Sequence, residues 1–406
     1  MSTTPPINYD DNRRLRHARS LLALLGLLLL ALLAGDWFMR FYWFRWQDVF
    51  RRPVEVNTPA AGFTTRVVPP RRGSDLSNFI PSALMRKRFE DEHPGGVISY
   101  DPAGYENLPY ASGSTFDIVV VGDSYMVAGM PQTNQISAQL AQLLGVPVLN
   151  RAVAGRGPFQ SLRYLVQEIG RGMAKPKLIV WGFIEREISG PSFVGFVYQL
   201  EKMADPDWQD ERVASSYNPW HHLAPAALRV SLPNSSALAQ LSQKIWSFIQ
   251  FNVAGRLPPE VIILEGKGSA KPLLGYGDAL NSMYWPPEVR RIDQAVYAVC
   301  YIRDYLEKLG IQLLVLPIHD KEQVYRDLIA PSDWRNGVPP PPSIIPSFAS
   351  QLEEQGISCI DLSSAFGEAR RRGVALYWRD DTHWNENGIR LAAEEIARSL
   401  STLRAH

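Results

Sequence analysis

Beyond residue 110, short apolar runs alternate with segments of helical spacing. The run 116–121 is rich in β-branched residues and ends at Gly122, which is typical of a strand buried on both faces. Segments with apolar residues at steps of three and four follow such runs, and this alternation predicts a parallel sheet with helical crossovers. The predicted strands are 116–121, 146–149, 177–181, 311–315 and 357–362, and the predicted helices are 135–144, 161–173, 289–309, 348–354 and 388–400.

Two stretches interrupt this alternation. Residues 47–110 are rich in proline, glycine and polar residues without a sustained period, so we expect a linker and an irregular lead-in. Residues from about 189 to 285 carry scattered proline and glycine, and we expect an inserted subdomain there. One amphipathic helix is predicted inside it, near 241–253, either packed on the main core or in contact with a membrane or an acceptor. The main domain is therefore predicted over 111–406, with one insertion.

The N-terminus has a different pattern. Residues 21–35 form an unbroken apolar run, with four arginines before it and an aromatic-rich stretch after it. This predicts a cytoplasmic tail over 1–19 and a transmembrane anchor with an aromatic belt over 20–46. A cleaved signal peptide is the alternative, but the most plausible cuts place a leucine where cleavage favours a small residue.

The orientation of this anchor is not decided by charge. Arginines on the far side of the run equal those before it in number, so the positive-inside rule gives no clear answer. A short N-terminal tail followed by a large domain suits a signal anchor. We therefore expect the bulk of the chain outside the cytoplasm, in the periplasm of a Gram-negative cell, with the anchor in the inner membrane.

Composition excludes several classes of partner. The 42 basic and 41 acidic residues give a net charge of +1, and no stripe of basic residues with interleaved aromatics is present, so nucleic acid is not expected as a partner. The two cysteines, Cys300 and Cys359, each lie in an apolar stretch and are expected to be buried free thiols. No zinc spacing, calcium loop or complete nucleotide fingerprint occurs, so neither a metal nor a cofactor is expected.

Candidate chemistry begins at the turn after the first predicted strand. Gly122 lets the chain bend, and Ser124 then lies at the carboxyl edge of the sheet, where open α/β folds bind ligands. Backbone N–H groups around Ser124 can point at a developing oxyanion. A serine that only caps a turn is the alternative reading of this short motif.

A second group of chemically active residues precedes the final predicted helix. His383 is accompanied by Asp380 and Asp381, so an acid lies both three and two positions before it. A serine hydroxyl needs an imidazole to accept its proton, and a carboxylate fixes the tautomer of that imidazole. The other histidines considered, His221, His222 and His319, are expected to be surface or structural groups.

Three blocks together resemble the SGNH (GDSL-type) hydrolase superfamily: Gly122-Asp-Ser124, Asn150-Arg-Ala-Val-Ala-Gly155 and Asp380-x-x-His383. More closely, 381–385 (Asp-Thr-His-Trp-Asn), 180–186 and 316–325 are similar to the SGNH-like acetyltransferases of the alginate O-acetylation group. The resemblance covers about 116–400 without the insertion. It implies a three-layer α/β fold with a central parallel sheet flanked by helices.

The resemblance also implies roles. Ser124 would be the nucleophile, His383 the general base, and the backbone N–H groups of Ser124 and Gly155 the oxyanion donors. Most SGNH hydrolases place the acid three residues before the histidine, which points to Asp380. The alginate group places it two before, which points to Asp381. The Asp-Thr-His-Trp string resembles the alginate group more closely and therefore favours Asp381. Two departures are visible: Gly182-Phe-Ile-Glu185 replaces the usual Gly-x-Asn-Asp block, and the serine precedes the Asp-x-His pair, unlike in the alginate group.

Several further residues are candidates for substrate binding. Glu185 and Arg186 follow a strand on the same edge as Ser124, where they can bind a sugar or form a structural ion pair. Lys321 and Tyr325 either line the cleft or stabilise a helix start. The complete set of candidates is Asp123, Asn150, Glu185, Arg186, Lys321, Tyr325 and Trp384.

These observations lead to a functional hypothesis. The resemblance implies O-acetyl transfer through an acyl-enzyme to an extracytoplasmic polysaccharide, with a membrane-bound O-acyltransferase partner delivering the acetyl donor. The anchor fits this because it holds the enzyme at the lipid bilayer, near such a donor. An SGNH esterase or deacetylase and a non-catalytic glycan-binding scaffold are the alternatives.

Overall fold

The chain divides into two compact units, Met1–Pro53 with Gln209–Trp246, and Val54–Trp208 with Ser247–His406. A computed structural model describes residues 9–38, 64–68, 75–76, 89, 92, 95–129, 131–154, 157–188, 193, 245–246, 249–250, 253, 256–267, 269, 271–285 and 292–405. The second unit contains the sheet and every candidate site residue that is described.

Helix α1 (Tyr9–Phe38) belongs to the first unit. Its stretch Arg16–Asp36 is long and apolar enough to cross a membrane, and none of it is buried. Its 21 residues span about 31 Å at the rise of an α-helix, close to the thickness of a bilayer's hydrocarbon core. The last part of the predicted anchor, 39–46, lies outside the described residues.

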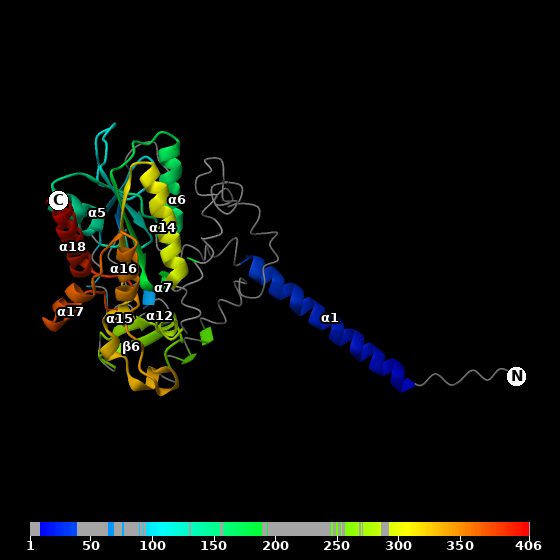
Figure 1. The fold of residues 1–406 in the computed structure, drawn as a ribbon. Helices are drawn as coiled ribbons and strands as arrows, with labels where there is room; N and C mark the ends of the chain where they lie inside the picture. Colours follow the sequence, from blue (N-terminus) through cyan, green and yellow to red (C-terminus); the bar gives the residue numbers. More distant parts are fainter. Residues whose placement is uncertain are drawn as a thin grey trace. The chain divides into compact units, whose positions relative to one another are not determined.

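The second unit is built on a sheet of five parallel strands (Figure 1). Their order across the sheet is β4-β3-β5-β8-β9, so the first strand of this sheet in the chain, β3, lies inside it. The connection to β4 extends the sheet on one side, and the later connections extend it on the other. The predicted α/β fold with a central parallel sheet is confirmed. The strands are β3 (Ile118–Gly122), β4 (Val148–Asn150), β5 (Leu178–Ile184), β8 (Gln312–Ile318) and β9 (Ser358–Cys359).

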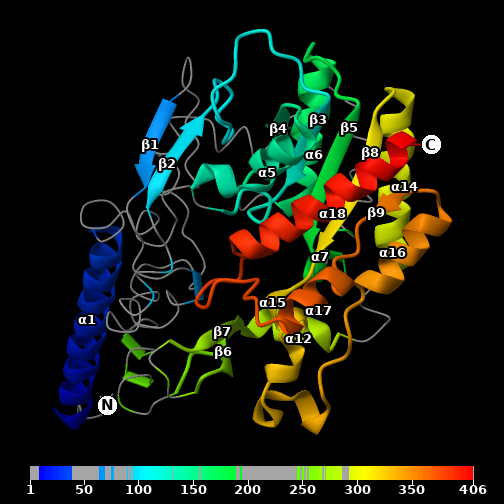
Figure 2. The same ribbon diagram turned by 90° about the vertical axis from the view of Figure 1, so that its left-hand side faces the viewer.

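Helices cover both faces of this sheet, as Figure 2 shows. Alternate residues of β3 enter opposite hydrophobic clusters, because successive side chains of a strand point to opposite faces. Ile118 and Val120 pack in the cluster of α5 (Ile136–Leu144) and α18 (Glu386–Ala405). Val119 and Val121 pack in the cluster that receives α6 (Gly157–Gly170), α14 (Ile292–Lys308) and α16 (Ile345–Glu354).

Short helices follow the carboxyl ends of the strands. After β5 and β8 come α7 (Glu185–Ile188) and α15 (Lys321–Val324), and α17 (Ser363–Arg371) lies shortly after β9. The five predicted strands and the five predicted helices outside the insertion are present, with β9 shorter and α18 longer than expected. Turns of 3₁₀-helix in the described part of the chain include η4 (Gln132–Asn134), η8 (Arg326–Leu328), η9 (Pro331–Asp333) and η10 (Arg335–Gly337).

The lead-in is more ordered than its composition predicts. Strands β1 (Thr64–Val68) and β2 (Gly96–Tyr100) form an antiparallel pair although 27 residues separate them. Ile98 is buried, and Gln132 exchanges two hydrogen bonds with the backbone of Ser99, which ties β2 to the main domain. The expectation of an irregular lead-in is therefore wrong for these strands, whose pairing partner is too distant to leave a local signal.

The end of the predicted insertion also belongs to the core of the domain. It contains β6 (Val261–Glu265) and β7 (Leu273–Tyr276), which are antiparallel, and α12 (Gly277–Met283). Leu264, Leu273, Leu280 and Met283 pack in the same cluster as β3 and α18. Residues 261–283 are thus no separate subdomain. In the predicted helix 241–253, only 245–246, 249–250 and 253 are described, all as helical.

Both cysteines are free, as predicted, but they are only partly buried. Cys300 lies on α14 and Cys359 on β9, at the margin of the hydrophobic cluster that these elements share.

Candidate active site

The turn that presents Ser124 depends on two facing glycines. Strand β3 ends at Gly122, whose φ of 151° is a conformation that residues with a side chain rarely adopt. Gly122 pairs with Gly182 of β5, and a Cβ at Gly122 would lie 2.3 Å from the Gly182 carbonyl oxygen. A Cβ at Gly182 would lie 2.1 Å from Met126 Sδ. The backbone therefore turns tightly at this point and places Ser124 at the carboxyl edge of the sheet.

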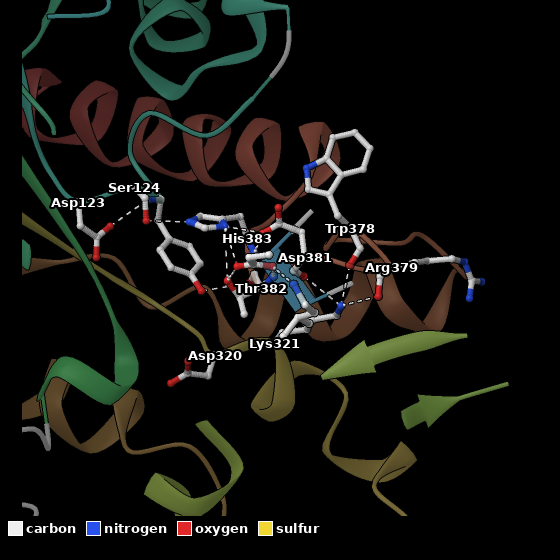
Figure 3. A network of polar contacts seen from close by, with 12 residues as sticks. Asp123, Ser124, Asp320, Lys321, Trp378, Arg379, Asp381, Thr382 and His383 are labelled. Atoms are coloured by element: carbon white, nitrogen blue, oxygen red, sulfur yellow. Dashed lines mark hydrogen bonds and ion pairs between the residues drawn. The ribbon is translucent and has the colours of Figure 1, made fainter. Parts of the chain in front are cut away.

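Three side chains meet at this edge in a hydrogen-bonded chain (Figure 3). The Ser124 Oγ lies 2.7 Å from Nε2 of His383, and Nδ1 of the same ring lies 2.5 Å from Oδ1 of Asp381. Nδ1–H donates to the carboxylate, which leaves Nε2 to accept the serine proton. Asp381 also accepts from the His383 backbone N–H at 2.9 Å, so one carboxylate fixes both the loop and the ring.

Asp380 takes a different position. Its side chain is fully buried, and its backbone carbonyl accepts from the Leu76 N–H at 3.1 Å. The His383 ring donates its hydrogen bond to Asp381, two positions before the histidine. The spacing of two residues, which the sequence favours, is thus the one that brings a carboxylate to the imidazole.

A further carboxylate, Asp75, approaches the histidine from the lead-in segment. It accepts from the backbone N–H of Thr382 at 2.9 Å and from the Thr382 hydroxyl, and its Oδ2 lies 3.7 Å from Nδ1 of His383. Leu76 is buried next to it and anchors this short stretch in a cluster with Phe89. Sequence reasoning missed Asp75, because nothing in the pattern around it distinguishes it from other acids in a polar segment.

Asp75, Asp381 and His383 also form a group whose ligand atoms lie close enough to hold a metal ion, within 4.8 Å of one another. A cation bound to Nδ1 would displace the proton that this nitrogen donates to Asp381. The same two carboxylates already accept hydrogen bonds from the backbone of the loop. The geometry therefore fits a hydrogen-bonded histidine better than a metal centre.

Lys321 holds the loop that carries Asp381 and His383. Its side chain is buried and its ammonium group donates to three backbone carbonyls, those of Trp378 (2.6 Å), Arg379 (3.0 Å) and Asp381 (3.1 Å). Burial lowers the pKa of Lys321 to about 8, although neighbouring carboxylates oppose this. All three donors of the ammonium are used on the loop, so Lys321 positions this loop, whereas the sequence left open a cleft-lining role or support of a helix start.

Two aromatic residues connect the serine turn to the histidine loop. The Tyr125 hydroxyl donates to the Thr382 carbonyl at 3.0 Å, and Nε1 of Trp384 donates to the Tyr125 carbonyl at 2.8 Å. The Tyr125 ring lies 4.4 Å from the His383 ring, centre to centre. Trp384 is fully buried, so it braces the site and does not face a ligand.

Charged groups surround the serine turn. Asp123 accepts from the Tyr125 N–H at 2.9 Å, and burial raises its pKa to about 6. Arg186 forms an ion pair with Asp320, which also accepts from the Arg186 backbone N–H. Burial raises the pKa of Asp320 and the guanidinium opposes that shift. The Arg186 guanidinium lies 5.8 Å from the Tyr125 ring, so of the two candidates after β5, Glu185 and Arg186, Arg186 is the one beside the serine turn.

Three other sequence candidates use their polar atoms inside the protein. Asn150 donates to the Glu106 carbonyl and accepts from the Ala152 N–H. The Tyr325 hydroxyl accepts from the Leu376 N–H at 3.0 Å. Glu185 accepts from Ser343 and from the Ile344 N–H, both at 2.8 Å. Each supports a loop at the edge of the sheet, and the structure does not bring them to Ser124.

Of the two expected oxyanion donors, one can be placed. Within the described part of the chain, the Ser124 backbone N–H has no acceptor, which leaves it available to a ligand oxygen. Gly155 lies outside the described residues.

Residues 49–185 and 283–406 match the family described as SGNH hydrolase-like domain, acetyltransferase AlgX. These two stretches make up more than half of the chain. The chain belongs to this family. The match ends at Glu185 and resumes at Met283. Ser124, Asp381 and His383 all lie in matched stretches, whereas most of the predicted insertion lies outside them.

Two curated relatives carry the name of a probable alginate O-acetylase. The chain is 27% identical over 184 residues to the "Probable alginate O-acetylase AlgJ" of Pseudomonas aeruginosa, a match that covers 40% of this chain and 44% of the relative. It is 26% identical over 103 residues to the protein of the same name from Pseudomonas putida, with 25% of each chain covered. The match spans less than half the length of either relative.

Solved structures resemble the AlgX-type chain only distantly. One is described as "a putative SGNH hydrolase from Slackia heliotrinireducens", with 14% identity, a TM-score of 0.33, and coverage of 71% of this chain and 100% of the other. Another is the salicylyl-acyltransferase SsfX3 from a tetracycline biosynthetic pathway, with 12% identity, a TM-score of 0.28, and coverage of 76% and 59%.

Proposed function

We propose that this chain is a membrane-anchored O-acetyltransferase that modifies a polysaccharide outside the cytoplasm through an acetyl-serine intermediate at Ser124. The observation that carries the proposal is the hydrogen-bonded chain from Ser124 through His383 to Asp381, in a member of an acetyltransferase family. This arrangement suits nucleophilic catalysis because the base is already oriented towards the serine hydroxyl.

The chemistry has two halves. In the first, Nε2 of His383 takes the proton of Ser124 as the serine oxygen bonds to the acetyl carbonyl carbon, and the imidazolium then gives that proton to the leaving group of the donor. In the second, a sugar hydroxyl gives its proton to Nε2 and attacks the acetyl-serine ester, and the serine oxygen leaves with the proton from His383. The sugar gains the acetyl group and the enzyme returns to its starting state.

Charge is stabilised on both sides of the serine during these steps. The carbonyl oxygen of each tetrahedral intermediate becomes negative, and the backbone N–H groups of Ser124 and Gly155 are the donors we assign to it. The imidazolium is stabilised by Asp381 in direct contact and by Asp75 at 3.7 Å. The missing Asn of the SGNH block leaves this site dependent on backbone donors.

The location follows from the anchor. The apolar stretch of α1 supports a single pass through the inner membrane, with the catalytic domain in the periplasm. A tethered enzyme meets a membrane-delivered acetyl donor at high effective concentration, so we assign the supply of acetyl groups to a membrane-bound O-acyltransferase partner. The names of the curated relatives support a polysaccharide as the acceptor.

The test is acetylation of the full chain, purified in detergent, by an activated acetyl ester. Peptide mass spectrometry is expected to find one acetyl group on Ser124, and a Ser124→Ala variant is expected to carry none. Equal labelling of the variant, or an unchanged polysaccharide acetylation phenotype in cells that carry it, would favour the scaffold. Addition of an oligosaccharide separates transfer from hydrolysis, since a transferase makes acetylated sugar and an esterase only releases acetate at an unchanged rate.

A further inference from the structure

The outer edge of β4 is paired with a side chain instead of a strand. β4 is the last strand on one side of the sheet, and its backbone bonds to β3 on the other side. On the outer side, the Asn107 amide pairs with Asn150, the last residue of β4. Its Oδ1 accepts from the Asn150 N–H at 2.8 Å, and its Nδ2 donates to the Asn150 carbonyl at 3.0 Å. Asn107 therefore makes both hydrogen bonds that a further strand would make to this residue.

A buried carboxylate fixes the direction of this amide. Oδ2 of Asp101 accepts from Nδ2 of Asn107 at 3.0 Å, from the Tyr110 hydroxyl at 3.0 Å and from the Arg151 guanidinium at 2.6 Å. The amide atom that faces this carboxylate must be a donor, so the amide oxygen is the atom left to accept from the Asn150 N–H. Asn107 and Asp101 are both buried, so these bonds form away from bulk water.

The residue after β4, Arg151, is held from the same segment. Its guanidinium pairs with Asp101 at 2.6 Å and with Glu168 of α6 at 2.9 Å, and it lies 4.4 Å from the centre of the Tyr105 ring. Arg151 thus offsets the charge of the buried Asp101, which makes the cluster an ion pair supported by hydrogen bonds. The lead-in segment 101–110 therefore fixes the last residue of β4 through its backbone and Arg151 through its side chain.

The loop after β4 leads to an expected oxyanion donor. The Val153 N–H donates to the Gly122 carbonyl at 3.1 Å, and Gly122 is the residue at which the chain turns towards Ser124. The loop is thus bound on one side to the lead-in segment and on the other to the serine turn. Gly155, whose N–H we assign to the oxyanion, follows two residues after Val153.

We propose that Asn107 is a positioning residue for acyl transfer. By completing the edge of β4, it sets where the following loop presents the Gly155 N–H to the carbonyl oxygen of the acyl group on Ser124. The inference rests on the proposed function and adds a supporting residue to it. An oxyanion donor is effective only within hydrogen-bonding distance of that oxygen, so a small shift of the loop weakens it. The usual Gly-x-Asn-Asp block is replaced in this chain, which makes the position of the backbone donors more important.

The test compares two acyl donors with the same leaving group on the full chain in detergent. One is an activated acetyl ester, and the other is its thiono analogue, in which sulfur replaces the carbonyl oxygen. Single-turnover acylation of Ser124 by each donor gives a ratio of the oxygen rate to the sulfur rate. N–H donors placed for oxygen stabilise the larger and weakly accepting sulfur less, so the wild type is expected to react about 100-fold faster with the oxygen ester. A displaced donor lowers this ratio, whereas a misplaced histidine slows both reactions alike.

The variant is Asn107→Ala, and its matched control is Gln132→Ala. The Gln132 amide also exchanges two hydrogen bonds with the backbone of one residue, Ser99 of β2, at 2.9 and 3.0 Å, and it is buried like Asn107. Both variants lose such a pair of bonds from the lead-in, so urea unfolding is expected to show stability losses of the same order. Only Asn107→Ala is expected to slow the oxygen ester, by about tenfold, and to lower the ratio by a similar factor.

A second variant, Arg151→Lys, keeps the positive charge but cannot contact Asp101 and Glu168 together, and it tests the same loop if Asn107→Ala does not fold. Its ratio is expected to fall in the same direction. A wild-type ratio near one, an unchanged ratio in Asn107→Ala and Arg151→Lys, or an equal fall in Gln132→Ala would each overturn the positioning role alone. A wild-type chain that is not acylated at Ser124 would overturn the proposed function and this role with it.

Discussion

Replacement of Lys321 by Met removes the ammonium group that holds the histidine loop while keeping the length of the side chain. The wild-type group makes three hydrogen bonds to loop carbonyls, and bonds of this charged type contribute about 2 kcal/mol each, or about 6 kcal/mol together. The pKa shift from 10.5 to about 8 shows that keeping the charge buried costs about 3 kcal/mol. The substitution is therefore expected to destabilise the fold by about 3 kcal/mol.

Activity is expected to fall further than this loss of stability explains. The carbonyl of Asp381 is one of the three acceptors, so a loop released from Lys321 misplaces both Asp381 and His383. A displacement of about 1 Å at a catalytic group can cost about 100-fold in rate, and we expect a decrease of that size in acetylation of Ser124. Urea unfolding and a stopped-flow assay with an activated acetyl ester measure the two effects.

The matched control is Lys177→Met, which removes an exposed lysine paired with Asp117 at 2.8 Å. It is expected to change stability by less than about 1 kcal/mol and to leave the acetylation rate unchanged, because exposed ion pairs contribute little. A Lys321→Met variant with the stability and rate of Lys177→Met would refute the assigned role of the buried lysine.

The pH dependence of stability gives the same reasoning an independent check. Between pH 8 and 10.5 the unfolded Lys321 is protonated and the folded one largely is not, so the unfolded state binds more protons. The contribution of this group therefore increases stability as the pH rises through that window, by up to about 3 kcal/mol. The difference in unfolding free energy between the wild type and Lys321→Met is expected to grow accordingly, and a flat difference would contradict the lowered pKa.

Three further predictions concern the serine turn and the acids near the histidine. Asp381→Asn is expected to slow acetylation of Ser124 by about 1,000-fold or more through loss of the correct histidine tautomer, and a stopped-flow assay should find a much smaller effect for Asp380→Asn. Gly122→Ala is expected to prevent folding because its Cβ would lie 2.3 Å from a carbonyl oxygen. The control Gly113→Ala is also at positive φ but in open space, and urea unfolding should show a loss of only about 1 kcal/mol. Asp75→Asn keeps an acceptor for the Thr382 hydroxyl but removes the charge near His383. Acetylation of Ser124 should therefore slow by about tenfold without a comparable loss of stability. A wild-type rate would show that Asp75 only supports the loop.

The alternation of strands and helices could be predicted because it is local. Buried parallel strands are continuous apolar runs, and their crossovers have helical spacing, so β3, β5 and α14 were recognisable from their own residues. The same holds for the serine turn, since a glycine after a buried strand indicates where the chain bends. The meeting of Ser124 and His383 required the family resemblance, because 259 residues separate them.

The rest of the site depends on contacts that leave no local pattern. Asp75 and Lys321 act on the backbone of a loop far along the chain, and a single acid or lysine in a sequence gives no indication of such a partner. Lys321, Asn150 and Tyr325 were correctly placed near the edge of the sheet. Their side chains, however, satisfy backbone groups of neighbouring loops, and only three-dimensional contacts separate that role from substrate binding.

The reciprocal contacts of Tyr125 and Trp384 have a consequence for the order of events. Two buried hydrogen bonds join the segment of the nucleophile to the segment of the base, so these segments cannot separate without breaking both. A site held in this way requires no closing motion to become reactive. In the proposed reaction, the serine can therefore take up an acyl group before any glycan arrives, and a polymer that arrives later meets an enzyme already charged for transfer.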